Sequence, residues 1–339
     1  MAHLGNFLRL HPLHTNELPD HPALNSLIHG PKGKQASNGS TPTNGAITRP
    51  DLRQFVTHIL TESSYFLDEA VLKTFANKGE KKSPPSYNGV ELLTHTYTQQ
   101  EMDAVPWRSA DVPRQWSSSG PKPAENWFGR RSRHANHSED GTATFSEFDY
   151  GLRHQHSEHE MAYTPDVYDC HEVLNYNMEL QDSMELDGAI RCGGSVGFTD
   201  VRMSVREMCH KLPFPLSPRT FPVLVIAAKG PQRHSLTVVQ IPIDISNLTS
   251  ALYSTGRNRT EGSSSINRKG VVLGIYTSIE HAQILPDQNI QWVMATASDA
   301  RGWLPMWMQK LGVPGAVVKD VGLFMKWISE IRGKGLHSE

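Results

Sequence analysis

The order of elements in the last third of the chain constrains its fold more than any other feature. Residues 221–228, 235–243, 270–285 and 289–297 are rich in β-branched residues, and turn signals such as Lys229-Gly-Pro231 separate them. The first two segments are expected to form an antiparallel hairpin. From Leu304 to Ile328, apolar residues then recur mostly three or four positions apart, which predicts a long C-terminal helix. Antiparallel strands that lead into one large amphipathic helix indicate the α+β class.

The preceding part of the chain supplies further elements. Pro50 and Asp51 suit the start of a helix, and apolar residues follow at helical spacing as far as Phe75. Strands are predicted at residues 89–98, 125–134 and 200–208, the second with its basic residues facing water. A helix is predicted at residues 144–161, whereas the pattern of residues 163–185 is ambiguous.

Composition divides the chain into two regions. Residues 1–48 are predicted to be disordered, because residues 30–45 are dense in Gly, Ser, Thr, Asn, Pro and Lys and offer little apolar surface to bury. Residues 49–335 are predicted to form one domain that carries polar loop insertions near residues 78–88, 107–124 and 255–268.

Bulk properties exclude several classes of function. The net charge of −2 gives no positive field for nucleic acid, so no nucleic-acid partner is predicted. Three scattered cysteines fit neither a disulfide framework nor a Cys-x-x-Cys metal site. The sequence contains no recognisable export signal or membrane span, so a cytoplasmic location is expected. No cofactor is predicted, and the oligomeric state is left open.

The start of the last helix carries a family resemblance. Ser298-Asp-Ala-Arg-Gly-Trp-Leu-Pro305 resembles the segment that opens the final helix of START domains. Its chemistry suits a turn from strand to helix, since Gly302 permits a sharp reversal and Asp299 can accept amide hydrogen bonds at a helix N-terminus. Upstream, Lys211-Leu-Pro-Phe-Pro-Leu-Ser-Pro-Arg219 resembles the proline-rich stretch before the central START strand. Over residues 205–334 the chain is similar to a START-like family of unknown function from filamentous fungi.

The resemblance implies a helix-grip fold, in which a curved antiparallel sheet wraps around the C-terminal helix and leaves an apolar cavity between them. Helix residues implied to line that cavity are Trp303, Trp307, Val317, Val321, Phe324 and Ile328. For any one of them, a plain core position is favoured over ligand contact. Arg219 is a further candidate for contact with a ligand head group, although a surface or structural role is favoured.

Polar candidates also lie on the strand predicted at residues 270–285. Tyr276 and Glu280 share one face of that strand, and Thr277 and His281 share the other. Which face points inward is left open. Tyr276 and Glu280 are the predicted ligand-binding pair.

The sequence therefore predicts binding, extending to transfer, of a lipid, sterol or similar apolar small molecule under the C-terminal helix. No catalytic residue is predicted, so an enzyme is the less favoured class. The alternative is a cyclase or dehydratase of secondary metabolism that uses the same cavity. A third interpretation is a regulatory module in which residues 1–48 contact a partner. In the last helix, the Gly312-Val-Pro-Gly315 interruption could act as a hinge. A fixed bend is slightly favoured over a hinge.

Two polar clusters invite stronger interpretations. The stretch from His154 to Glu160 places His156 and His159 three positions apart, as in a zinc-binding helix, but no third or fourth ligand is obvious nearby. A solvated helix face is preferred, and no metal is predicted. The basic run from Arg130 to His134 could touch acidic lipid head groups during transient membrane contact, although a solvated strand is preferred.

Overall fold

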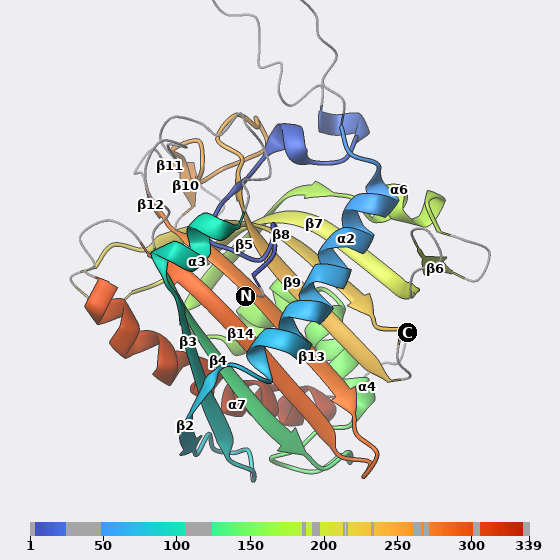
Figure 1. Ribbon diagram of the computed structural model, residues 1–339, viewed down its shortest axis with the longest axis vertical. Coiled ribbons are helices and arrows are strands. Elements are labelled where there is room, and N and C mark those ends of the chain that lie inside the picture. Colours follow the sequence, from blue (N-terminus) through green and yellow to red (C-terminus); the bar gives the residue numbers. More distant parts are fainter. Residues whose placement is uncertain are drawn as a thin grey trace, which may run out of the picture.

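The computed structural model describes residues 4–24, 49–105, 124–184, 188–191, 197–212, 214, 216–231, 234–259, 266–267, 271–300 and 306–334, with the side chains of residues 266–267 and 306–311 excepted. Its centre is a curved antiparallel sheet with the strand order β2-β3-β4-β14-β13-β9-β8-β7-β5 (Figure 1). These strands are β2 (Ala76–Lys81), β3 (Val90–Tyr97), β4 (Glu125–His134), β5 (Val167–Asn175), β7 (Phe198–His210), β8 (Arg219–Lys229), β9 (Ser235–Asp244), β13 (Ile275–Ile284) and β14 (Ile290–Asp299).

Short strands complete the β structure. β1 (Leu13–His14) and β12 (Val272–Leu273) pair in parallel with β9 and β8, and β6 (Ala189–Ile190) pairs with β7. β10 (Asn258–Arg259) and β11 (Ile266–Asn267) form a separate two-stranded sheet. The predicted β8–β9 hairpin is confirmed, and β13 and β14 form a second one. Pairing of β14 with β4 joins the early strands of the chain to the late ones.

Helices cover both faces of the sheet. They are η1 (Thr15–Glu17), α2 (Leu52–Tyr65) with its π-helical continuation η2 (Phe66–Val71), α3 (Gln99–Ala104), α4 (Phe145–Phe148), η4 (Asp149–Arg153), α5 (His156–Tyr163), α6 (Asn177–Asp182) and α7 (Met306–Arg332). In Figure 1, α2 crosses in front of the sheet, while α4 and α7 lie behind it. One hydrophobic cluster joins α2 and the N-terminal segment to the near face, and a second joins α4, α5 and α7 to the far face. This arrangement confirms the predicted α+β helix-grip order.

The N-terminal segment departs from the prediction of disorder, which is wrong for residues 4–24. Leu8, Leu13 and Leu18 are fully buried in the cluster shared with α2. The backbone is held as well, because the Glu62 carboxylate of α2 accepts hydrogen bonds from the amides of Asn6, Phe7 and Leu8 at 2.8, 2.7 and 2.9 Å. The remaining part of that prediction, residues 1–3 and 25–48, lies outside the described residues.

The helix predicted at residues 144–161 is interrupted. α4 and η4 end at Arg153, and α5 begins at His156 after Gln155, whose φ of 42° is left-handed. The break follows from burial of Arg153, whose guanidinium binds Asp149 of η4 and Asp200 of β7. The ambiguous residues that follow contain β5 and α6.

The predicted loop insertions have mixed outcomes. Residues 78–88 begin within β2, which is exposed along its whole length. Most of residues 107–124 lie outside the described residues, and residues 255–268 contain β10 and β11. α7 continues through Pro314, so the interruption seen in the sequence does not divide the helix, and its use as a hinge stays a prediction. Among the described residues, no helix is long and apolar enough to span a membrane.

Candidate functional site

A row of polar side chains crosses the face of the sheet that α7 covers. Arg130 of β4 lies opposite Met294 of β14, which lies opposite Glu280 of β13. Two strand spacings separate the outer pair, about 10 Å, and the long arginine side chain spans them. Arg130 NH2 donates a hydrogen bond to Glu280 Oε1 at 2.8 Å, with 2% and 11% of the two side chains exposed. A buried ion pair therefore lies at the centre of the covered face.

The partners of Arg130 leave part of its guanidinium unused. Its Cζ lies 3.8 Å from the centre of the Trp292 ring, and Trp292 Nε1 donates to the same Glu280 oxygen at 2.8 Å. The Nε and NH1 donors of Arg130 are buried and have no hydrogen-bond partner among the described residues. Because an unpaired buried donor is costly, these two atoms mark a place where an acceptor would gain binding energy.

α5 presents a second polar group to this face through His156, Glu160 and Tyr163, which share one side of the helix. His156 Nδ1 donates to the Leu152 carbonyl at 2.7 Å, which leaves Nε2 to accept from Gln240 Nε2 at 3.0 Å. The same amide nitrogen lies 3.4 Å from Glu160 Oε2. Gln240 therefore links β9 to α5.

α7 contributes a third carboxyl, that of Asp320. The helix is fixed at this level by Ser83, whose Oγ donates to the Val318 carbonyl at 2.7 Å and accepts from the Gly322 amide at 2.8 Å. Gly322 allows that approach, since a Cβ there would lie 2.3 Å from the Pro84 carbonyl oxygen. The contact fixes the turn of α7 that carries Asp320, which is half-buried.

Electrostatic interactions connect these groups. Burial raises the pKa of Asp320 to about 7; Arg130 opposes this shift, and Glu160 and Glu280 add to it. Burial also raises the pKa of Glu160, against the influence of His156. The pKa of Tyr163 is raised well above its usual value, chiefly by burial. The interior thus combines a cation with carboxyls that resist ionisation.

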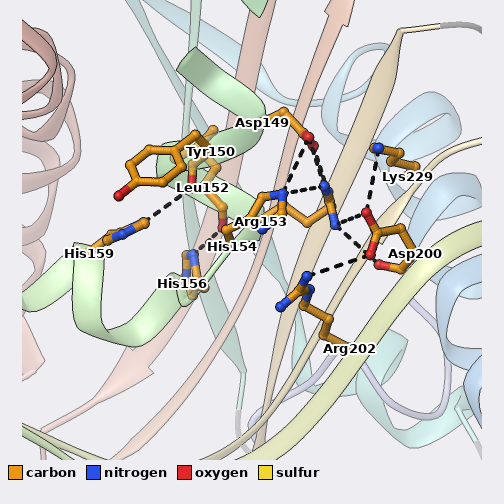
Figure 2. Close-up of polar contacts among 10 residues, drawn as sticks. All are labelled: Asp149, Tyr150, Leu152, Arg153, His154, His156, His159, Asp200, Arg202 and Lys229. Atoms are coloured by element: carbon orange, nitrogen blue, oxygen red, sulfur yellow. Dashed lines mark hydrogen bonds and ion pairs between the residues drawn. The ribbon is translucent and has the colours of Figure 1, made fainter. Parts of the chain in front are cut away.

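The histidine cluster is buried rather than solvated, so the preferred interpretation of residues 154–160 is wrong for His156 and His159. Figure 2 shows the two rings turned toward the carbonyls of Leu152 and Tyr150, and the His159 Nδ1 to Tyr150 O distance is 3.1 Å. These contacts occupy one nitrogen of each ring.

The ion pairs beside the histidines have a structural role. Arg153 is fully buried, donates to Asp149 Oδ1 and Oδ2 at 2.5 and 2.7 Å, and reaches Asp200 Oδ2 at 2.7 Å. Figure 2 also shows Arg202 and Lys229 beside Asp200. This network anchors the turn between η4 and α5, and so sets the orientation of α5 over the sheet.

The structure places the predicted site residues in different environments. Tyr276 and Glu280 lie on the α7 side of β13, which settles the face that the sequence left open. Val317, Val321, Phe324 and Ile328 are buried on α7. Phe324 packs among aromatic rings, 5.0 Å from Trp292 and 5.1 Å from Phe148 between ring centres. Trp303 and the side chain of Trp307 lie outside the described residues.

Arg219 begins β8 and is buried. Its Nε donates to the Ala300 carbonyl at 2.7 Å, and NH1 donates to the Ser217 carbonyl. These contacts join the start of β8 to the end of β14.

Two important positions were misplaced by sequence reasoning. Arg130 was expected to face water, but alternation along β4 turns Arg131 and Arg133 outward to Glu91 and Asp287 and turns Arg130 inward. Asp320 was expected on the outer side of α7. Its spacing of three from Val317 and four from Phe324 was a usable signal for the inner side.

A separate pocket of about 280 Å³ lies where β8 begins and β9 ends. It is lined by Pro12, Pro222, Pro242, Ile243, Asp244, Ile245, Ser246, Ser254, Leu273, Gly274 and Ile275. None of the predicted site residues borders it. The Asp244 carboxylate there already accepts from the amide and hydroxyl of Ser246.

Comparison with known proteins places the chain within a family. A family model described as "Protein of unknown function (DUF3074)" matches residues 127–328. No curated protein matches the chain.

Solved structures show similarity as well. The crystal structure of human STARD10 aligns with 11% identity and a TM-score of 0.46 over 86% of each chain. Human StAR-related lipid transfer protein 5 aligns with 11% identity and a TM-score of 0.45 over 83% of this chain and 96% of that one. A STAR-related lipid transfer protein fragment from Xanthomonas axonopodis aligns with 9% identity and a TM-score of 0.39 over 75% and 98%. Nothing about a ligand follows from likeness at this level.

Proposed function

The chain belongs to the family of unknown function DUF3074, and we propose that it binds an apolar small molecule, of the lipid or sterol class, between the sheet and helices α5 and α7. The observation that carries the proposal is Arg130, a buried arginine with two hydrogen-bond donors that have no partner among the described residues. A polar head group would use those donors, and apolar side chains around them would hold the rest of the ligand.

The partial exposure of two carboxyl side chains under α5 and α7 supports the presence of space for a ligand. Burial raises the pKa of Glu160 and of Asp320. Even so, Glu160 keeps 19% of its side chain exposed, and Asp320 is half-buried. Side chains that are enclosed by protein and still accessible border an internal space. We infer that this space is the binding cavity.

The predicted lining residues acquire roles in this proposal. Arg130, Glu280 and Tyr276 would contact the head group from the sheet. Val317 and Val321 would contact the apolar body from α7. Each methylene removed from water contributes about 0.8 kcal/mol, so a chain of ten carbons offers on the order of 8 kcal/mol before the costs of ordering. Trp303 and Trp307 stay predictions from the sequence, as does a head-group role for Arg219.

Three parts of the proposal rest on the sequence alone. They are transfer between membranes, transient contact with a membrane surface and a cytoplasmic location. The cyclase or dehydratase alternative also stays a prediction, without a further observation in its favour.

Uptake of a fluorescent fatty alcohol or sterol by the purified full chain tests the proposal. Native mass spectrometry would give the stoichiometry, and one ligand per chain is expected. Arg130→Lys keeps the positive charge and removes the planar fork of donors, so affinity should fall about tenfold, the loss of one good hydrogen bond to a charged group. Arg131→Lys is the matched control, because Arg131 faces outward. If the wild-type chain takes up no apolar compound, the proposal fails.

A further inference from the structure

The interior cluster contains more carboxyl groups than cations. Glu280, Glu160 and Asp320 come from β13, α5 and α7, and each of the other two carboxyls contributes to the electrostatic environment of Asp320. Arg130 is the cation that faces them from β4. A head group bound at the free donors of Arg130 would therefore meet three carboxyls as well.

The three carboxyls differ in how well they are paired. Glu280 is paired with Arg130 at 2.8 Å. Glu160 lies 3.4 Å from the Gln240 amide nitrogen and 3.6 Å from His156 Nε2. Within the described part of the chain, the Asp320 carboxyl accepts no hydrogen bond from a side chain or amide. The carboxyls of Glu160 and Asp320 are therefore not neutralised by Arg130 and can interact electrostatically with an incoming ligand.

We propose that Asp320 and Glu160 act as a charge filter, which admits apolar ligands with an uncharged oxygen head and rejects those that end in a carboxylate, sulfate or phosphate. The inference rests on the proposed binding function and specifies its substrate class. A hydroxyl or carbonyl oxygen can accept from Arg130 Nε and NH1 without adding charge. An anionic head would gain the same donors but would add negative charge beside groups that already resist ionisation, in surroundings where water screens little.

The fold keeps both filter residues in place. Ser83 clamps α7 on either side of Asp320 through Val318 and Gly322. Glu160 lies on the same side of α5 as His156 and Tyr163, and α5 begins directly after the buried Arg153 network. Because neither helix can turn its carboxyl away without breaking these contacts, an anionic ligand cannot escape the repulsion by local rearrangement.

Protonation should relax the filter. Asp320 faces Arg130 of β4, Glu280 of β13 and Glu160 of α5, with Lys319 beside it on α7. The pKa of Asp320 is raised to about 7, so Asp320 becomes neutral as pH falls below that value. Burial also raises the pKa of Glu160, so Glu160 gains its proton at a higher pH than an ordinary glutamate. Discrimination against anions should then weaken in acid.

Three ten-carbon probes test the filter on the full chain: decanol, decyl sulfate and decylammonium. Displacement of a bound fluorescent alcohol would be measured at about pH 8, above the pKa of Asp320. Decanol should bind at least about tenfold more tightly than decyl sulfate, as expected for repulsion between partly buried like charges. Decyl sulfate stays anionic in acid, so its disadvantage should shrink at about pH 5.5 because the protein changes.

The variant Asp320→Asn/Glu160→Gln should narrow the affinity difference between decanol and decyl sulfate, chiefly by binding decyl sulfate more tightly. Glu330→Gln is the matched control, because Glu330 is on the exposed side of α7 and pairs with Lys326. Equal wild-type affinity for decanol and decyl sulfate would overturn the filter and leave the binding function standing. Decylammonium carries the opposite charge and should not share the disadvantage of decyl sulfate. If it binds as weakly as decyl sulfate, the site rejects any charge and the carboxyl filter is overturned. If none of the probes binds, the proposed function itself fails.

Discussion

At the scale of single residues, Arg130 decides most of the chemistry of the interior. Its charge is balanced by Glu280, and its ring contact with Trp292 adds a cation–π interaction. Breaking a buried ion pair is more costly than never forming one, because the remaining charge stays buried without a partner.

Replacement of Arg130 by Met should therefore lower the free energy of unfolding by about 3–5 kcal/mol, the usual cost of an orphaned buried charge. Arg130→Met/Glu280→Leu should recover much of that loss, because no charge is then left alone. Urea denaturation of the single and double variants measures both effects. Arg131→Met, which breaks a half-exposed pair with Glu91, should cost less than about 1 kcal/mol. Additive effects of the Arg130 and Glu280 substitutions would contradict the pairing.

Asp320 makes a second prediction, on pH dependence. Its pKa is about 7 in the folded chain and near 4 when unfolded, so between these values unfolding releases a proton. The carboxyl therefore destabilises the fold increasingly as pH rises through that window. Asp320→Asn should be more stable than the wild type, with a gain of about 1–3 kcal/mol near pH 8 and a smaller gain near pH 5.

Thermal unfolding at the two pH values measures the difference. A gain that does not change with pH would mean that Asp320 titrates normally in the folded chain.

At the scale of elements, local sequence patterns predicted where the strands lie better than they predicted which side of each strand is buried. The β8–β9 hairpin and β14 followed from β-branched runs and turn residues that lie next to each other in the chain. The orientation of Arg130 did not follow. β4 is covered on both faces, so apolar and polar residues do not alternate cleanly along it, and its basic residues gave no hint of which side is buried.

The buried N-terminal segment was missed for a similar reason. The prediction of disorder rested on the polar composition of residues 30–45. The leucines of residues 4–24 pack against distant residues of α2 and the sheet, which no local pattern reports. Gly322 and Ser83 likewise lie far apart in the chain, and the clamp that they form on α7 is a tertiary contact.

Loss of that clamp gives a prediction for α7. Ser83→Ala removes the hydroxyl that donates to the Val318 carbonyl and accepts from the Gly322 amide, which should cost about 1–3 kcal/mol. Amide hydrogen exchange should accelerate around residues 318–322 more than at the Arg332 end, where Glu147 still holds the helix at 2.7 and 2.9 Å. Ser86→Ala, at an exposed site in the same loop, is the control. Uniform acceleration along α7 would argue against a local clamp.

Glu62 gives a prediction for the N-terminal segment. Glu62→Ala removes the acceptor for three backbone amides and should destabilise the chain by about 2–3 kcal/mol. The first 24 residues should then become sensitive to limited proteolysis while the sheet stays protected. Glu69→Ala, which breaks an exposed pair with Lys73 on the same helical stretch, should leave proteolysis unchanged. A regulatory role for residues 1–48 would therefore involve a segment of which residues 4–24 are packed against α2 and the sheet.

At the scale of the whole molecule, the sheet separates two hydrophobic regions with different characters. The side that faces α2 and the N-terminal segment holds the larger apolar cluster together with the buried Arg9 and Glu125. The side that faces α5 and α7 encloses Arg130, Glu160, Glu280 and Asp320. A protein has little reason to bury so many ionisable groups for stability alone, because their desolvation is costly. The two donors of Arg130 that have no partner among the described residues are what locates the proposed ligand on the α7 side.

Photo-crosslinking with a diazirine-bearing fatty alcohol, followed by peptide mapping of the full chain, tests that location most directly. The proposal predicts crosslinks in peptides of β13, β14, α5 and α7, and their loss when unlabelled alcohol competes. Competed crosslinks confined to α2 and the N-terminal segment, or no competed crosslinks at all, would contradict a binding cavity between the sheet and α7.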